Sequence, residues 1–388
     1  MKALIKKYNF VPVLLTFFVM GFCDVVGIST SYVKNDFNLS ETVAGFVPSM
    51  VFIWFLLLGV PTALLMNRIG RKKTVQISNI VTFVGMLLPF LGYNIVSCLT
   101  AFALLGIGNT MLQVSLNPLL TNVVKGDKLT SCLTAGQVVK AVSSFCGPFI
   151  ALFAVQVLGA WQYLFPIFGL ITLLSWALLG VTGIEEEPLA KGTSVGEAFS
   201  ILKDGKILMF FFGILFVVGV DVGTNTVAPK LLMERCGAAI EKAALASSVY
   251  FICRTGGALL GSVLLSKMKE SLYMTIHILG AIASLVALFF IQGQIGILVC
   301  IGAIGYFCSS IFPAIFGLAL KARPEKANEI SGLMITAICG GGIVTPLMGF
   351  LTDRLGSQAG SLIVIAACMA YLLFLALASS RQPAAQKS

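Results

Sequence analysis

The chain has 388 residues, of which 58% are hydrophobic and 11% are charged, and its formal net charge is +10. Soluble domains carry about 25% charged residues, so this composition excludes an ordinary water-soluble protein. The apolar runs are long enough for membrane-spanning helices of about 20 residues and lack the short alternating pattern of a membrane β-barrel. The single histidine, His277, excludes a multi-histidine metal site. We therefore expect an all-α integral membrane protein with no metal and no cofactor.

Apolar segments bounded by charged residues or by Gly, Pro and Asn predict twelve membrane spans. In chain order they cover residues 10–33, 43–66, 74–93, 96–124, 131–157, 161–182, 207–232, 243–266, 271–291, 294–320, 328–351 and 359–380. The longest polar interruption separates two groups of six spans. We expect an N-terminal bundle over 1–182, a linker over 183–206 and a C-terminal bundle over 207–388.

Lys and Arg are concentrated in loops that share one side of the expected membrane. The loops on that side contain Lys2, Lys6, Lys7, Arg68, Arg71, Lys72, Lys73, Lys125, Lys128, Lys267, Lys269, Lys321, Arg323 and Lys326. The opposite side keeps Lys34, Lys230, Arg235, Lys242 and Arg354. Because cytoplasmic loops are enriched in Lys and Arg, we expect both termini and the linker in the cytoplasm, with the chain spanning the cell (inner) membrane. The positive charge then lies beside anionic lipids and does not indicate a nucleic-acid partner.

Four charged side chains lie deep within the expected spans: Asp24, Lys140, Asp221 and Arg254. Each costs about 2.5–3.5 kcal/mol at the centre of a membrane helix unless it is paired or solvated. One interpretation is two internal ion pairs that hold helices in register. The other is a cavity that binds a substrate and carries a proton. Because the two carboxylates recur at matching places in the two halves, the pattern favours the second interpretation.

Amide side chains accompany these charges within the spans. Gln113 and Asn117 lie one turn apart in span four, Gln137 lies three residues before Lys140, and Asn225 lies one turn after Asp221. An amide both donates and accepts hydrogen bonds, as the hydroxyls of a sugar require. For each amide the alternative is a hydrogen bond between helices. The sequence has no HExxH or phosphate-loop motif, and its glycine clusters, such as 340–342, predict close helix packing, so we expect no enzyme.

The segments Phe312–Lys321 and Gly340–Asp353 resemble spans ten and eleven of the fucose permease family of sugar/proton symporters. The loop Leu64–Lys73 is similar to the loop between spans two and three of major facilitators in general. The resemblance implies the major facilitator fold, in which two pseudo-symmetric six-helix bundles hold a substrate site between them at the membrane midplane. It also implies import of a monosaccharide by proton-coupled alternating access.

The resemblance implies roles for the candidate residues. Asp24 and Asp221 would couple the proton, although the family carries its first Asp about one turn later and has Glu at the second position. The substrate-binding residues would be Gln113, Asn117, Gln137, Lys140, Asn225 and Arg254. Gln113 stands where the family has Glu, and Lys140 stands where the family has an Asn that contacts the sugar.

Two interpretations of Lys140 in span five remain possible. Lys140 pairs with Asp24, since spans one and five pack together in this architecture, or it receives the carboxylate of the substrate together with Arg254. The substrate is therefore a neutral hexose or deoxyhexose, or an acidic sugar such as a sialic or uronic acid. Sodium-coupled or facilitative transport, and efflux of another small polar solute, are the alternatives to proton symport. We expect a monomer whose partners are the small-molecule substrate and the lipid bilayer.

Overall fold

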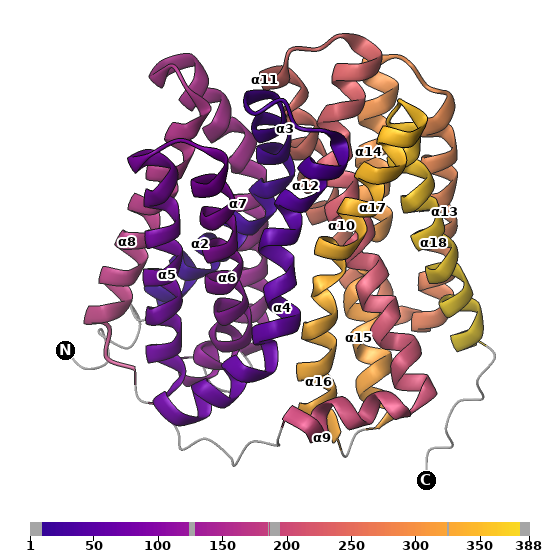
Figure 1. Cartoon of the computed structure of the whole chain (residues 1–388). Helices are drawn as coiled ribbons and strands as arrows, with labels where there is room; N and C mark the ends of the chain where they lie inside the picture. Colours follow the sequence, from indigo (N-terminus) through magenta and orange to yellow (C-terminus); the bar gives the residue numbers. More distant parts are fainter. Residues whose placement is uncertain (1–9, 124–128, 185, 187–194, 324–325, 381–388) are drawn as a thin grey trace.

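The computed structural model describes residues 10–123, 129–184, 186, 195–323 and 326–380, and all regular structure in these ranges is helical. Twelve helical segments are long and apolar enough to cross a membrane. This confirms the expected all-α membrane fold and its twelve spans. Figure 1 shows the spans as two side-by-side bundles, one from each half of the chain.

The N-terminal bundle begins with a discontinuous span made of α2 (Phe10–Met20), the 3₁₀ segment η1 (Gly21–Val25) and α3 (Val26–Asp36). Its other spans are α4 (Glu41–Ile69), α5 (Arg71–Leu91), α6 (Ile95–Val123), α7 (Leu129–Leu158) and, after η3 (Trp161–Tyr163), α8 (Leu164–Val181). The C-terminal bundle contains α10 (Gly205–Cys236), α11 (Ile240–Ala243) with α12 (Leu245–Lys267), α13 (Glu270–Phe290), α14 (Gln294–Cys308) with α15 (Ile311–Ala322), α16 (Ala327–Thr336) with η6 (Ala337–Cys339) and α17 (Gly340–Leu355), and α18 (Ala359–Ser380).

The linker between the bundles contains the helix α9 (Val195–Ser200) and the 3₁₀ turn η4 (Ile201–Lys203), and α9 packs against α16. Asp204 then begins α10, because its carboxylate accepts a hydrogen bond from the Lys206 backbone N–H at 2.9 Å. Figure 1 shows α9 at the lower end of the bundles and α3 and α11 at the upper end. We call these ends the linker side and the far side.

The two bundles meet along three pairs of spans. α4 packs against α17, α7 against α12, and α3 against α10. Glycine allows the closest of these approaches, because small residues let membrane helices come together. A Cβ on Gly349 would overlap the Glu41 backbone oxygen. At Gly342, the Ser49 hydroxyl donates a hydrogen bond to the backbone carbonyl.

The glycine cluster 340–342 confirms the expected role in close packing. Within the C-terminal bundle, Gly340 touches α10 so closely that a Cβ would overlap the Leu215 carbonyl oxygen. This contact holds the break between η6 and α17 against α10. The hydropathy of the sequence does not predict the interruption between η6 and α17, because η6 is apolar, whereas η1 contains the charged side chain of Asp24.

Gly340→Ala should therefore lower the free energy of unfolding by about 1–3 kcal/mol, the usual cost of overpacking, since the obstructing atom belongs to backbone. Gly332→Ala is the matched control in the same span, because nothing lies within 4 Å of the added Cβ. Thermal melting of the purified protein in detergent measures both variants. Equal melting temperatures would contradict this account of the packing.

Candidate substrate and proton site

Asp24 lies in η1, where the first span changes from α2 to α3. A 3₁₀ interruption within a longer helix often marks a functional hinge. The Asp24 Oδ2 accepts a hydrogen bond from the Ser144 hydroxyl of α7 at 2.6 Å, and the Cys23 thiol approaches Oδ1 at 3.5 Å. The carboxylate is therefore held by neutral donors.

Asp221 forms an ion pair within the C-terminal bundle. Its Oδ2 lies 2.8 Å from Nη2 of Arg254 on α12, and its Oδ1 accepts a hydrogen bond from the Tyr250 hydroxyl on the same helix. The Asp221 and Arg254 side chains remain 23% and 33% exposed. The pair thus compensates its own charge and remains partly exposed.

Lys140 lies on α7, one turn before Ser144, and α7 packs against α2 and η1 as expected. The Ser144 hydroxyl lies 3.1 Å from the Lys140 carbonyl oxygen and 2.6 Å from the Asp24 carboxylate. Among the residues that the structure describes, however, no carboxylate pairs with the Lys140 ammonium. The ion pair between Lys140 and Asp24, one of the two readings of the sequence, is absent from this conformation.

Two of the candidate amides are already bonded to protein. Asn225 donates from Nδ2 to the Asp24 backbone oxygen at 2.8 Å, so it connects α10 of one bundle to η1 of the other. Gln113 donates to the side-chain oxygen of Asn109 at 3.0 Å, and Asn109 donates to the Met20 carbonyl oxygen at 2.7 Å. The interhelical interpretation therefore describes the donor of Asn225, whereas Gln113 donates within α6 and reaches α2 only through Asn109.

Other amide atoms near the charges are unsatisfied. The side-chain oxygens of Asn117 and Asn225 are buried without a hydrogen-bond partner in the described part of the chain. Gln137 is exposed. These groups can accept or donate hydrogen bonds to a ligand, because a buried polar atom without a partner carries an energetic penalty that a ligand can remove.

Ser144 and Tyr250 are site residues that the sequence analysis did not select. Each lies one helical turn from a buried cation, Ser144 after Lys140 and Tyr250 before Arg254. Because residues four apart share a helix face, their spacing from those cations was the signal that could have identified them.

Buried charges also occur at the far side, where the sequence analysis expected loop residues. The Glu41 carboxylate of α4 lies 2.8 Å from the Lys34 ammonium and 2.5 Å from the Lys230 ammonium of α10. Glu41 and Lys230 are 8% and 9% exposed. Lys230 lies on the side expected from the Lys and Arg pattern, but its expected place in a loop is wrong: it is buried in α10, because Glu41 of the other bundle supplies its counter-charge.

Asp353 at the end of α17 strengthens the same junction. Its carboxylate accepts hydrogen bonds from the backbone N–H groups of Glu41 and Thr42 at 2.9 and 2.8 Å, and these groups begin α4. A carboxylate is favoured at the N-terminus of a helix by the orphan N–H groups and the helix dipole. The far side is thus closed by one ion-pair network and one helix cap.

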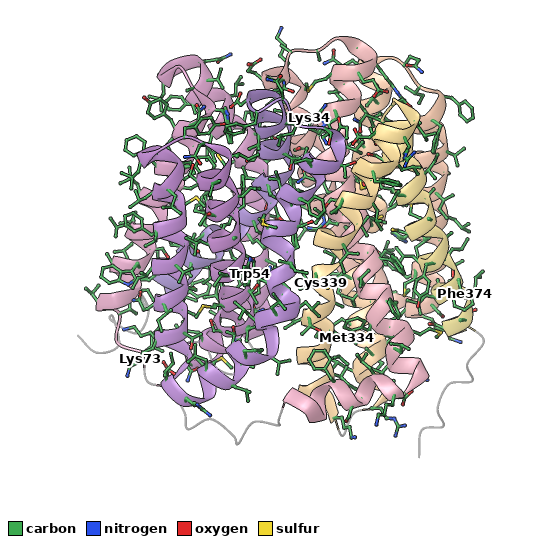
Figure 2. The ribbon with its side chains drawn as sticks, viewed as in Figure 1. Lys34, Trp54, Lys73, Met334, Cys339 and Phe374 are labelled. Atoms are coloured by element: carbon green, nitrogen blue, oxygen red, sulfur yellow. The ribbon has the colours of Figure 1, made fainter. Side chains whose placement is uncertain are left out.

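The hydrogen bonds recorded between the two bundles lie near the centre or at the far side. Within the described ranges, none joins the bundles near the linker side. Figure 2 shows Lys34 at the far side and Lys73 at the linker side, with Trp54 and Cys339 between these levels on either side of the boundary between the bundles. The structure therefore represents a conformation closed at the far side.

Comparison with known proteins identifies the family. A family model of the Major Facilitator Superfamily matches residues 13–346. The chain belongs to the Major Facilitator Superfamily. This match confirms the fold implied by the resemblance, and the superfamily members compared below are all transporters.

Two curated superfamily proteins and one solved structure illustrate the similarity. A glucose/galactose transporter of Brucella abortus is 27% identical over 97% of this chain and 95% of its own length. An L-fucose-proton symporter of Escherichia coli is 30% identical over 32% of this chain and 28% of its own length. The structure of the transporter FucP in the outward conformation aligns with a TM-score of 0.70 at 20% identity, covering 97% of this chain and 100% of that one.

The stability costs of removing the two partners of the Asp221–Arg254 pair should not be additive, because the first change already leaves the other charge without its partner. Breaking a fully buried pair costs about 3–5 kcal/mol. Because the pair is partly exposed, we expect Arg254→Gln to cost about 2–3 kcal/mol, and we expect Asp221→Asn combined with Arg254→Gln to cost less than the sum of the single changes. A double-mutant cycle on melting in detergent measures the coupling, and additive costs would exclude the pair.

Glu41→Gln should loosen the far side, because it leaves Lys34 and Lys230 without their shared counter-charge. Hydrogen–deuterium exchange measured by mass spectrometry should become faster at the first turn of α4 and the last turns of α10 and α17. Glu270→Gln is the matched control, since Glu270 pairs with Lys321 within one bundle at the linker side. Unchanged exchange at the far side in Glu41→Gln would contradict a closing role for the network.

Proposed function

We propose that the chain imports a monosaccharide by proton-coupled alternating access. The observation that carries the proposal is a central pair of carboxylates, one from each bundle, at the boundary where the bundles meet. Asp24 and Asp221 belong to matching spans, and Asn225 connects those spans directly. The curated relatives are named for transport of glucose and galactose and for fucose–proton symport, which supports a sugar substrate and a proton as coupling ion.

The closed far side supports an inward-facing state in this proposal. The excess of Lys and Arg on the linker side indicates that this side is cytoplasmic in the cell (inner) membrane. Opening to the outside then requires separation of Glu41 from Lys230 and of Asp353 from the start of α4. Closure at the linker side would follow as the two bundles rock around the central site.

The coupling step would use the different environments of the two carboxylates. A proton on Asp221 removes the charge that attracts Arg254 and releases the guanidinium to a substrate or to water. A proton on Asp24 leaves its neutral partner, Ser144, in place. The two aspartates therefore have distinct roles: protonation of Asp221 breaks an ion pair, whereas protonation of Asp24 neutralises a carboxylate that has only neutral donors.

The substrate would be held by amide and cationic groups. Asn117 and Gln137 have atoms available for sugar hydroxyls, whereas Gln113 and Asn225 would have to exchange a protein partner for the sugar. Lys140 and Arg254 supply positive charge. A neutral hexose or deoxyhexose and an acidic sugar such as a sialic or uronic acid both fit this set of donors.

Asp221→Asn and Asp24→Asn should each abolish accumulation of sugar in proteoliposomes driven by an imposed pH gradient, because neither amide exchanges a proton. Counterflow exchange without a gradient should persist in at least one of the two variants. Asp204→Asn is the control, since Asp204 caps α10 outside the spans. The transported sugars to be measured are glucose, galactose, fucose, glucuronate and N-acetylneuraminate.

A wild-type protein that takes up sugar equally with and without the pH gradient would exclude proton coupling. Dependence on a sodium gradient would then identify sodium symport, and equilibration without either gradient would identify facilitative transport. Accumulation against the expected direction in inside-out vesicles would identify efflux.

A further inference from the structure

The Lys140 ammonium forms no ion pair with a carboxylate among the residues that the structure describes. Two other cations inside the described spans have counter-ions: Lys230 pairs with Glu41, and Arg254 pairs with Asp221. Lys140 is partly buried on α7. Charged groups inside membrane proteins are normally paired or mark a ligand pathway. The unpaired ammonium therefore points to a ligand that brings its own negative charge.

The carboxylates of Asp24 and Asp221 form hydrogen bonds or an ion pair with donors other than Lys140. The Asp24 Oδ2 accepts from Ser144 at 2.6 Å, and the Asp221 oxygens accept from Arg254 and Tyr250. Lys140 still lies within electrostatic range of Asp221 and of the Cys23 thiol beside Asp24. Its ammonium thus contributes to the central charge cluster without belonging to either bonded group.

The charges at the centre balance only when both carboxylates are ionised. Lys140 and Arg254 then supply two positive charges against the two negative charges of Asp24 and Asp221. Binding of one coupling proton leaves an excess of one positive charge in a region of low dielectric constant, where uncompensated charge is unfavourable. A neutral sugar would leave this excess in place, whereas a substrate carboxylate would remove it.

The surroundings of Lys140 suit the rest of a sugar acid. Gln137 lies three residues earlier on the same face of α7 and is exposed. The buried side-chain oxygen of Asn117 on α6 has no partner in the described ranges. Gln137 can bond a hydroxyl of a ring whose carboxylate lies at the lysine, and Asn117 belongs to a helix that packs against α7. An ammonium and two amides provide one charged and several neutral contacts for a single monosaccharide.

We propose that Lys140 forms a carboxylate subsite and that the transported substrate is a sugar acid. This inference rests on the proposed function and narrows its substrate class. One proton and one sugar carboxylate then cross together, so the net charge of the loaded site stays at zero. The transport cycle is electroneutral for such a substrate.

Binding to the wild-type chain tests the subsite without a mutation. D-glucuronate and its neutral isostere D-glucuronamide differ only in the charge of one group, and N-acetylneuraminate and D-glucose extend the comparison. Calorimetric titration of the purified protein should give a Kd for at least one of the two acids that is about tenfold or more below the Kd values of the neutral compounds, a difference of about 1.4 kcal/mol. If the neutral compounds bind as tightly as the acids, the carboxylate subsite is wrong and sugar transport stands.

Three variants test whether Lys140 causes the preference for acidic over neutral sugars. Lys140→Asn should abolish the preference for the acid over the neutral compound, and Lys140→Arg should retain it because the charge remains. Lys242→Asn, an exposed far-side lysine, should leave the preference unchanged. A retained preference in Lys140→Asn would overturn the proposal. Absence of binding by every sugar would contradict both the subsite and the proposed function.

Uptake into proteoliposomes tests independently whether transport of the sugar acid is electroneutral. A pH gradient should drive accumulation of the preferred acid, and a potential imposed with potassium and valinomycin should not, because the loaded site carries no net charge across the membrane. Accumulation driven by the potential alone would overturn electroneutral symport of a sugar acid while leaving proton-coupled sugar transport in place.

Discussion

Compensation of charge inside the bilayer is the constraint on which the rest of this structure depends. Asp221 is compensated within its own bundle by Arg254, and Glu41 is compensated by lysines from both bundles. The first pair can be retained when the bundles move apart, whereas the link from Glu41 to Lys230 exists only when the far side is closed. The location of each counter-ion thus decides whether a charge stabilises a bundle or a conformation of the whole protein.

The central site combines these charges with interruptions of the helices. Asp24 lies in a 3₁₀ segment, and the partner bundle contributes Asn225, which donates to the backbone of the same segment. A change in the relative position of the bundles must therefore alter the hydrogen bonding at Asp24. Through this hydrogen bond, protonation of Asp24 and the relative position of the two bundles can influence each other.

The sequence predicted the spans well and the site partially. Span number and the division into halves follow from hydropathy, and the glycine cluster 340–342 was correctly expected to pack closely. Two internal ion pairs were one interpretation of the four charges; the structure contains one, between Asp221 and Arg254, and lacks the pairing of Lys140 with Asp24. Ser144 and Tyr250 were not selected, because hydroxyl groups are common in membrane helices and become site residues only through the helix opposite them.

The sequence by itself determined that the chain crosses the membrane and where polar groups lie along each span, because burial of backbone in lipid requires long apolar helices. Only the tertiary structure decided which polar groups meet. Lys230 and Glu41 are 189 residues apart in the chain but form one ion pair. Such contacts depend on which helix faces oppose one another after packing, a property that no local pattern specifies. The lack of an ion pair at Lys140 among the described residues became evident for the same reason, once Asp24 and Asp221 had been assigned other donors.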